Sequence, residues 1–343
     1  MNAVAHKKEE RMETRNLGRS GLRVSAIGLG CNNLGGRLDH AASMRVVHAA
    51  LDLGITFFDT ADVYPLGKSG MSEQYLGEAL GERRKDVVVA TKFGSPRKRA
   101  VGAVPTAGGV QGGGSRRYIM EAVETSLRDL RTDYIDLYQM HRADPLTPID
   151  ETVRALDDLI RQGKVRYVGC SNYPAWRVVD AVRVAEALGA ERFVACQDEY
   201  SLLVRYVDPE LVPAMQKLGL GMLPYFPLAG GMLTGKYDMD APLPEGTRFT
   251  QWPKTMTERF LAEPNRTMYA ALQAFCKARG RSILELAISW LLMRPTVSSV
   301  IAGASSPEQL KQNTEATGWT LTADEMAELD RITAPALRAT SHL

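Results

Sequence analysis

Residues 55–64 read ITFFDTADVY, and this stretch decides how the chain folds. A short apolar run stops at Asp59, and Tyr64 follows across a polar turn. An apolar run of this length, bounded by polar residues, is typical of a buried β-strand. Asp59 is the unexpected member, because a parallel sheet that is covered on both faces excludes a carboxylate that has no partner.

Two later stretches repeat this pattern. VVVATKF, residues 87–93, carries Lys92 near its end, and YIDLYQMH, residues 134–141, ends in His141. Three apolar strands therefore deliver an acid, a base and an imidazole at the same relative position. Because an unpaired buried charge costs several kcal/mol, these groups at matching strand ends predict one shared site.

The rest of the chain alternates between apolar runs of strand length and helical patterns. We expect a β-hairpin around Gly18–Gly21, then strands near 24–29, 55–59, 87–92, 134–141, 165–170, 194–197, 221–225 and 299–302. Helical patterns lie near 41–53, 72–84, 115–130, 149–162, 175–188, 209–218, 265–279, 283–293, 307–314 and 323–333.

Repeated strand–helix units form either a doubly wound sheet or a barrel, and eight units favour the barrel. We therefore predict an α/β fold: a (β/α)8 TIM barrel with an N-terminal β-hairpin, long loops at its C-terminal face and extra helices. Residues 15–343 form a single domain in this interpretation, after a disordered tail at 1–14. Two long segments without a clear pattern, 94–114 and 229–263, are expected to be functional loops.

The composition excludes several classes of protein. A net charge of +2 on 343 residues gives no case for a nucleic-acid or membrane partner. The longest apolar stretches have strand length, and the first residues carry no secretory signal. The four cysteines are widely spaced, which favours free thiols in a reducing, cytoplasmic setting. The composition gives no oligomeric state.

Other kinds of site have weaker support in the sequence. GLGCNNLGG, residues 28–36, resembles a dinucleotide-binding turn, but Asn33 stands at the third glycine position. A metal site has little support, because only His141 among five histidines ends a strand. A nucleophilic Cys170 is a weaker hypothesis, since cysteines beside buried strands are usually inert. Asp59 and Lys92 could also be a purely structural ion pair.

An acid, a lysine and a tyrosine together have a definite chemical use. Free tyrosine titrates near pH ~10, which is too high for proton exchange at neutral pH. An ammonium at Lys92 lowers the pKa of Tyr64, and Asp59 holds that ammonium charged and in place. Tyr64 would then act as a general acid or base, while a neutral His141 polarises a carbonyl. No nucleophile is evident, so a bound cofactor must supply the hydride.

These residues stand in motifs that resemble the aldo-keto reductases, which are NAD(P)-dependent (β/α)8-barrel oxidoreductases. The motifs are FFDTADVY, VATKF, LYQMHRAD, VGCSN, PYFPLAGGMLTGKY and IAGASSPEQLKQN, in that order, and the resemblance spans residues 15–334. It implies a catalytic tetrad of Asp59, Tyr64, Lys92 and His141, with Tyr64 as proton donor when a carbonyl is reduced.

The resemblance also implies a cofactor site, residue by residue. Ser171, Asn172 and Gln197 match the residues that hold the nicotinamide amide, and Tyr225 matches the aromatic that stacks on its ring. The pyrophosphate loop matches Phe226, Leu228, Gly230 and Lys236. An arginine near a 2′-phosphate matches Arg248, and the adenosine site matches Gly303, Ser305, Gln309 and Asn313.

The sequence departs from the family at one position, because some members carry a lysine where Gly303 stands. Arg248 and Lys236 are then left to distinguish the cofactors. We expect NADP, as NADPH, with NAD possible, since arginine binds phosphate with two parallel hydrogen bonds. The implied substrate is a small carbonyl compound or alcohol.

The resemblance is strongest to bacterial members and to relatives of potassium-channel β subunits. The second of these implies another function, a redox-sensing regulatory subunit that binds NADP(H) with little turnover. His141 favours catalysis, because channel-associated relatives commonly have asparagine at its position.

Overall fold

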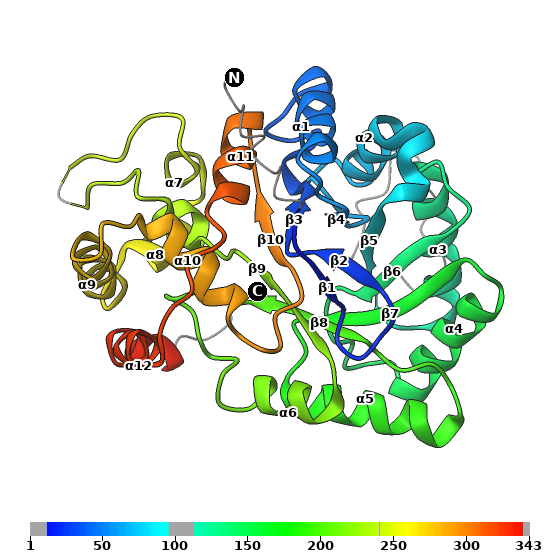
Figure 1. The fold of residues 1–343 in the computed structure, drawn as a ribbon. Coiled ribbons are helices and arrows are strands. Elements are labelled where there is room, and N and C mark those ends of the chain that lie inside the picture. Colours follow the sequence, from blue (N-terminus) through cyan, green and yellow to red (C-terminus); the bar gives the residue numbers. More distant parts are fainter. Residues whose placement is uncertain (1–11, 96–112, 240, 339–343) are drawn as a thin grey trace, which may run out of the picture.

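The computed structural model describes residues 12–95, 113–239 and 241–338. In this part of the chain, eight parallel strands form one nearly closed barrel with helices around it (Figure 1). The strands are β3 (Ile27–Gly30), β4 (Phe57–Asp59), β5 (Val88–Phe93), β6 (Ile135–Met140), β7 (Val165–Ser171), β8 (Ala195–Glu199), β9 (Gly221–Tyr225) and β10 (Val300–Gly303).

The strands neighbour one another in sequence order, and β10 pairs with β3. Between β9 and β10 the ring is completed by a parallel bridge that joins Met222 to Val297. This confirms the predicted TIM barrel, and the structure agrees with the rejection of a dinucleotide-binding turn at residues 28–36. Residues 31–33 form a short 3-10 helix there, rather than the N-terminus of a long helix that a dinucleotide-binding turn requires.

The helices that the sequence predicted lie close to their expected positions, and several begin at capping residues that are readable in sequence. Ser115 caps α3, and capping boxes begin α10 and α12. The helices are α1 (His40–Asp52), α2 (Met71–Leu80), α3 (Arg116–Asp129), α4 (Ile149–Arg161), α5 (Ala175–Leu188), α6 (Leu211–Leu218), α7 (Arg248–Gln251), α8 (Lys254–Leu261), α9 (Asn265–Lys277), α10 (Ile283–Leu292), α11 (Pro307–Glu315) and α12 (Ala323–Ile332).

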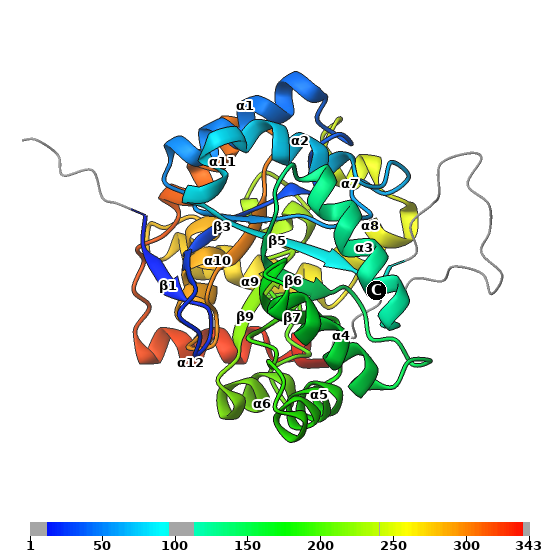
Figure 2. The same cartoon turned by 90° about the vertical axis from the view of Figure 1, so that its right-hand side faces the viewer.

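An antiparallel hairpin of β1 (Thr14–Asn16) and β2 (Arg23–Ser25) lies across the barrel at the start of its strands (Figures 1 and 2). Leu17 and Val24 from this hairpin pack with the apolar side chains inside the barrel. The turn approaches the backbone so closely that a Cβ at Gly18 would lie 2.6 Å from the carbonyl oxygen of Gly219. The hairpin therefore closes the N-terminal end of the barrel, which leaves the other end for a site.

Two details of the prediction were wrong. The expected strand at 24–29 is divided at Ala26, where β2 of the hairpin ends and β3 of the barrel begins. The segment 229–263 is not a loop throughout, since it contains η3 (Ala229–Thr234), α7 and α8. Glycines and prolines interrupt the periodic pattern in this segment, so short helices there are not readable.

Some predictions fall on parts of the chain outside the described residues. The predicted loop at 94–114 is described only at its two ends, and the predicted tail at 1–14 only from residue 12, with Thr14 already in β1. The single-domain assignment stays a prediction. No helix in the described ranges is both long enough and apolar enough to cross a membrane.

Candidate active site

A buried ion pair joins β4 to β5 at the C-terminal end of the barrel. Lys92 Nζ lies 2.8 and 2.7 Å from the two carboxylate oxygens of Asp59. It also donates to the carbonyl oxygen of Thr60 at 2.8 Å. Lys92 is 0% exposed and Asp59 4%, and the amide of Gln197 donates to Asp59 Oδ1 at 2.8 Å. The carboxylate is thus shared between an ammonium and an amide from the far side of the barrel.

The surroundings keep this lysine charged. Burial lowers the pKa of Lys92, but Asp59 and its hydrogen bonds, together with Tyr64, raise it by more, so the pKa lies above its usual value. A buried ammonium needs such a partner, because an uncompensated one loses its proton instead. Lys92 therefore places a permanent positive charge inside the barrel.

Tyr64 follows β4 on the loop before α2, and its ring lies against this charge. The distance from Lys92 Nζ to the ring centroid is 5.2 Å. The ring meets His141 edge to face, with centroids 5.7 Å apart. The three strand ends that the sequence singled out, and the tyrosine, are therefore in one place.

The expected direction of the tyrosine pKa was wrong. Burial raises the pKa of Tyr64, while Lys92 and Arg142 lower it by less, so its pKa lies above the usual value. The sequence reveals the neighbouring ammonium but not how deeply the phenol is buried. Tyr64 is consequently protonated at neutral pH, and the ammonium reduces the cost of the phenolate that forms when the proton leaves.

His141 follows β6 directly and is held by its backbone. Its N–H donates to the carbonyl oxygen of Phe93 at 2.8 Å, and its own carbonyl accepts from Asn172 Nδ2 at 3.1 Å. Burial, Lys92 and Arg142 lower the pKa of the His141 ring to about 3, so the imidazole is neutral. Its Nδ1 is buried without a hydrogen-bond partner among the described residues, while the residue also lines a cavity.

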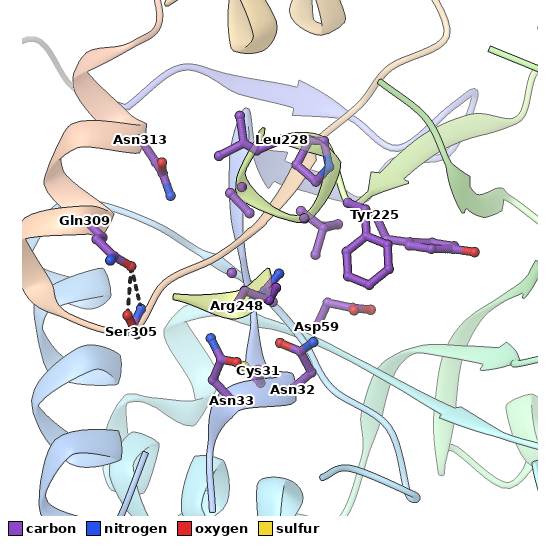
Figure 3. Close-up of a pocket in the computed structure, with 18 of the residues that line it drawn as sticks. Cys31, Asn32, Asn33, Asp59, Tyr225, Leu228, Arg248, Ser305, Gln309 and Asn313 are labelled. Atoms are coloured by element: carbon purple, nitrogen blue, oxygen red, sulfur yellow. Dashed lines mark hydrogen bonds between the residues drawn. The ribbon is translucent and has the colours of Figure 1, made fainter. Parts of the chain in front are cut away.

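One cavity brings the predicted residues together at this end of the barrel (Figure 3). Asp59, Tyr64 and His141 line it, and Lys92 contacts it through Asp59. All the predicted cofactor residues line the same cavity: Ser171, Asn172, Gln197, Tyr225, Phe226, Leu228, Gly230, Lys236, Arg248, Gly303, Ser305, Gln309 and Asn313.

The residues after β7 and β9 form a connected set of hydrogen bonds. Asn172 donates to Ser171 Oγ at 3.0 Å and accepts from the hydroxyl of Tyr225 at 2.8 Å. Asn172 has a φ of 56°, in the left-handed region that few non-glycine residues adopt. Backbone of this kind persists only where its surroundings fix it, and it is frequent at functional sites.

The loop after β9 curves tightly around the cavity. Phe226 and Ala229 have φ angles of 49° and 47°, and Gly230 follows at 69°. A Cβ on Gly230 would lie 2.9 Å from ring atoms of Phe249 and Trp252, so only glycine fits. Phe226, Leu228 and Gly230 of this turn line the cavity, and turns with residues in the left-handed region often form anion-binding concavities.

Three cations gather at one part of the cavity. Arg37, Lys236 and Arg248 all line it, and no carboxylate of the described residues pairs with any of them. Burial, Arg37 and Arg248 lower the pKa of Lys236, and burial and Arg37 lower that of Arg248. Cations that destabilise one another without a compensating acid are typical of an anion-binding site.

The departure at Gly303 has a structural counterpart. A Cβ added at Gly303 would lie 3.6 Å from Nη2 of Arg248, so the arginine fills the space beside this glycine. On the neighbouring helix α11, Gln309 accepts hydrogen bonds from both the N–H and the hydroxyl of Ser305, drawn as dashes in Figure 3. In that view Ser305 and Gln309 lie across the cavity from Tyr225.

Two cations that line the cavity were not predicted from the sequence. Arg37 and Arg142 carry charge at the cavity but belong to no periodic pattern, although Arg142 could have been found as the residue after His141.

The thiols of Cys170 and Cys196 are buried 3.6 Å apart, and burial raises the pKa of Cys170 well above its usual value. A thiol in that state is a poor nucleophile.

Comparison with known proteins now identifies the family. Residues 26–334 match the profile described as the Aldo/keto reductase family. The chain belongs to the aldo/keto reductase family. Among similar proteins, an uncharacterized oxidoreductase, YrpG of Bacillus subtilis (strain 168), is 36% identical over 94% of this chain and 96% of its own length.

Two further relatives of this reductase carry more specific names. The L-glyceraldehyde 3-phosphate reductase of Escherichia coli O157:H7 is 34% identical, over 93% of this chain and 92% of that protein. A probable voltage-gated potassium channel subunit beta of Oryza sativa subsp. japonica is 37% identical, over 89% and 91%. The chain is thus an NAD(P)H-dependent oxidoreductase of the branch that includes both groups.

The neutral state of His141 predicts a particular dependence of stability on pH. Its pKa is about 3 in the folded protein and near 6.5 in the unfolded chain. Between these values only the unfolded chain binds the proton, so the free energy of unfolding decreases as the pH falls from 6.5 towards 3. In His141→Asn this contribution is lost, and stability should decline less steeply on acidification.

Denaturant unfolding of both proteins at several pH values measures the difference. Above about pH 7 histidine is neutral in both states, so the two curves should run parallel there, which serves as the internal control. Equal slopes below pH 6 would show that the His141 ring accepts its proton freely in the folded protein.

Proposed function

We propose that this reductase converts an aldehyde or ketone to the alcohol with NADPH, reversibly, and that Tyr64 donates the proton. The observation that carries the proposal is the buried Lys92 ammonium, held by Asp59 and lying 5.2 Å from the ring of a protonated Tyr64. The relative named for L-glyceraldehyde 3-phosphate acts on an aldehyde, which supports the same reaction class.

Each member of the tetrad has a separate task. Tyr64 gives its proton to the carbonyl oxygen as that oxygen becomes an alcohol, and Lys92 stabilises the phenolate left behind. Asp59 keeps Lys92 charged and in position. The neutral His141 ring donates a hydrogen bond to the same oxygen and so orients it. A bound nicotinamide supplies the hydride in this chemistry.

The cavity suits a nicotinamide dinucleotide on its own features. The left-handed turn after β9 is complementary to phosphate groups, and so are Arg37, Lys236 and Arg248, which have no acidic partner among the described residues. Ser171, Asn172 and Gln197 would hold the amide, and Tyr225 would cover one face of the ring. The remaining predicted residues would surround the phosphates and adenosine: Phe226, Leu228, Gly230, Lys236, Arg248, Gly303, Ser305, Gln309 and Asn313.

A regulatory role is the second candidate, because one group of relatives is named for channel β subunits. The assembled tetrad argues for turnover, since a pure sensor does not need a protonated phenol beside a buried ammonium. A stable complex with a membrane protein, without oxidation of NADPH by any of a broad panel of carbonyl compounds, would favour regulation instead.

Tyr64→Phe is the direct test of the proton donor. The variant should lose roughly 10²- to 10⁴-fold in kcat, because the general acid is gone. Its dissociation constant for NADPH should change little, since the hydroxyl is not needed to bind the cofactor. Tyr75→Phe, on α2 and outside the cavity, is the matched control and should keep full activity. A Tyr64→Phe protein with normal turnover would remove Tyr64 from the mechanism.

Arg248→Gln tests the choice of cofactor. Loss of a charge-assisted contact to a 2′-phosphate should weaken NADPH binding by roughly 10- to 100-fold. NADH binding should weaken far less, because that cofactor lacks the phosphate. Fluorescence titration with each cofactor measures the ratio, and Lys254→Gln on the exposed face of α8 is the control. An equal loss for both cofactors would contradict the assignment of Arg248 to the 2′-phosphate.

A further inference from the structure

The cavity carries a fourth cation in addition to the three, Arg37, Lys236 and Arg248, that gather at one part of it. Asp59 is the one acid among its described lining residues, and Lys92 already neutralises it. Four lining residues are cations: Arg37, Arg142, Lys236 and Arg248. The cavity as a whole therefore attracts anions, and one of these cations lies apart from the other three.

The four cations divide into two sets according to the groups whose pKa values they shift. Arg37 and Arg248 lower the pKa of Lys236, and Arg37 lowers that of Arg248. Arg142 instead lowers the pKa of Tyr64 and of His141. Arg142 follows His141 directly in the chain and lines the same cavity as Tyr64 and His141, whereas Arg37, Lys236 and Arg248 act on one another.

The fold holds this arginine at the rim of the cavity. Its neighbour His141 is tied to β5 through the bond from its N–H to Phe93, and to the loop after β7 through Asn172. The backbone directly before Arg142 is thus held by two hydrogen bonds. Only the long side chain is free, and it is exposed at the cavity wall.

Among the described residues, Arg142 has neither an ion pair nor a hydrogen-bond partner for its guanidinium. The nearest acid along the chain, Asp144, is occupied elsewhere: its Oδ2 accepts from the N–H of Gly114 and the hydroxyl of Thr147, and its Oδ1 from the N–H of Leu146. Within the described part of the chain nothing occupies the five guanidinium N–H donors of Arg142, so a ligand can accept from them.

We propose that the substrate is a small carbonyl compound that also carries a phosphate or carboxylate, and that Arg142 binds this anionic group. The planar guanidinium can form two parallel hydrogen bonds to either anion. The carbonyl would then be fixed between Tyr64 and His141 by its own anionic end. This inference rests on the proposed reductase function and narrows its substrate class.

Matched pairs of aldehydes test the proposal. Glycolaldehyde is compared with glycolaldehyde phosphate, and butanal with succinic semialdehyde, so that each pair differs mainly by the anion. The kcat/KM of each is measured with NADPH for the wild-type protein, Arg142→Gln, Arg142→Lys and Arg154→Gln. Arg154 is exposed on α4 and outside the cavity lining, so its variant is the matched control.

The quantity compared is kcat/KM for the anionic substrate divided by kcat/KM for its neutral partner. Arg142→Gln should lower this ratio by roughly 10- to 100-fold in at least one pair, mostly by raising KM for the anionic substrate. Arg142→Lys should restore part of the ratio, and Arg154→Gln should keep it. The pair that responds distinguishes phosphate from carboxylate. Inorganic phosphate should also compete with glycolaldehyde in the wild-type protein and much less in Arg142→Gln.

Failure of the inference and failure of the reductase assignment give different results. The first case is that the wild-type protein reduces both members of each pair and Arg142→Gln lowers kcat/KM equally for both. The arginine then acts on Tyr64 alone, and the inference is overturned. If no aldehyde is reduced, the proposed function is overturned. Calorimetric titration of phosphate into the NADP⁺-bound wild-type and Arg142→Gln proteins then still decides whether Arg142 binds anions.

Discussion

The buried ion pair of Lys92 and Asp59 is the constraint on which the site depends. Neither residue can be lost alone, because removing one partner of a buried pair leaves a charge that costs about 3–5 kcal/mol. The pair fixes β4 against β5, and Gln197 extends the contact to β8. A barrel buried on all sides can hold these groups only because they satisfy one another. Their position then determines where Tyr64 and His141 must lie.

The N-terminal end of the barrel is closed by apolar packing, and the C-terminal end holds the candidate site. The hairpin closes the N-terminal end with Leu17 and Val24, so the interior there is apolar and filled. The C-terminal end carries the polar groups and the cavity. Its loops contain the left-handed residues Asn172 and Phe226, which a loop tolerates when its neighbours hold it. The cations Arg37, Arg142, Lys236 and Arg248 all line this cavity, so the charge of the site gathers at the same end.

Much of this could be predicted from the sequence, because it depends on local patterns. Apolar runs of strand length predicted the barrel. The ionisable residues at their ends predicted that Asp59, Lys92 and His141 share one site. The short helices after β9 and the role of Arg37 could not be predicted, since they follow from packing between distant segments. The pKa of Tyr64 was misjudged for the same reason: the ammonium is visible in sequence, but burial, which outweighs it, is not.

In the proposed mechanism, Lys92 lowers the free-energy cost of forming the Tyr64 phenolate. Alcohol oxidation measures this directly, because Tyr64 must accept a proton and its rate should rise with pH. The double variant Asp59→Asn with Lys92→Met removes the charge without leaving an unpaired partner. Its pH–rate profile should be displaced to higher pH relative to the wild-type protein, because Lys92 lowers the pKa of Tyr64 by more than Asp59 raises it. A profile that superimposes on that of the wild-type protein would contradict the claim.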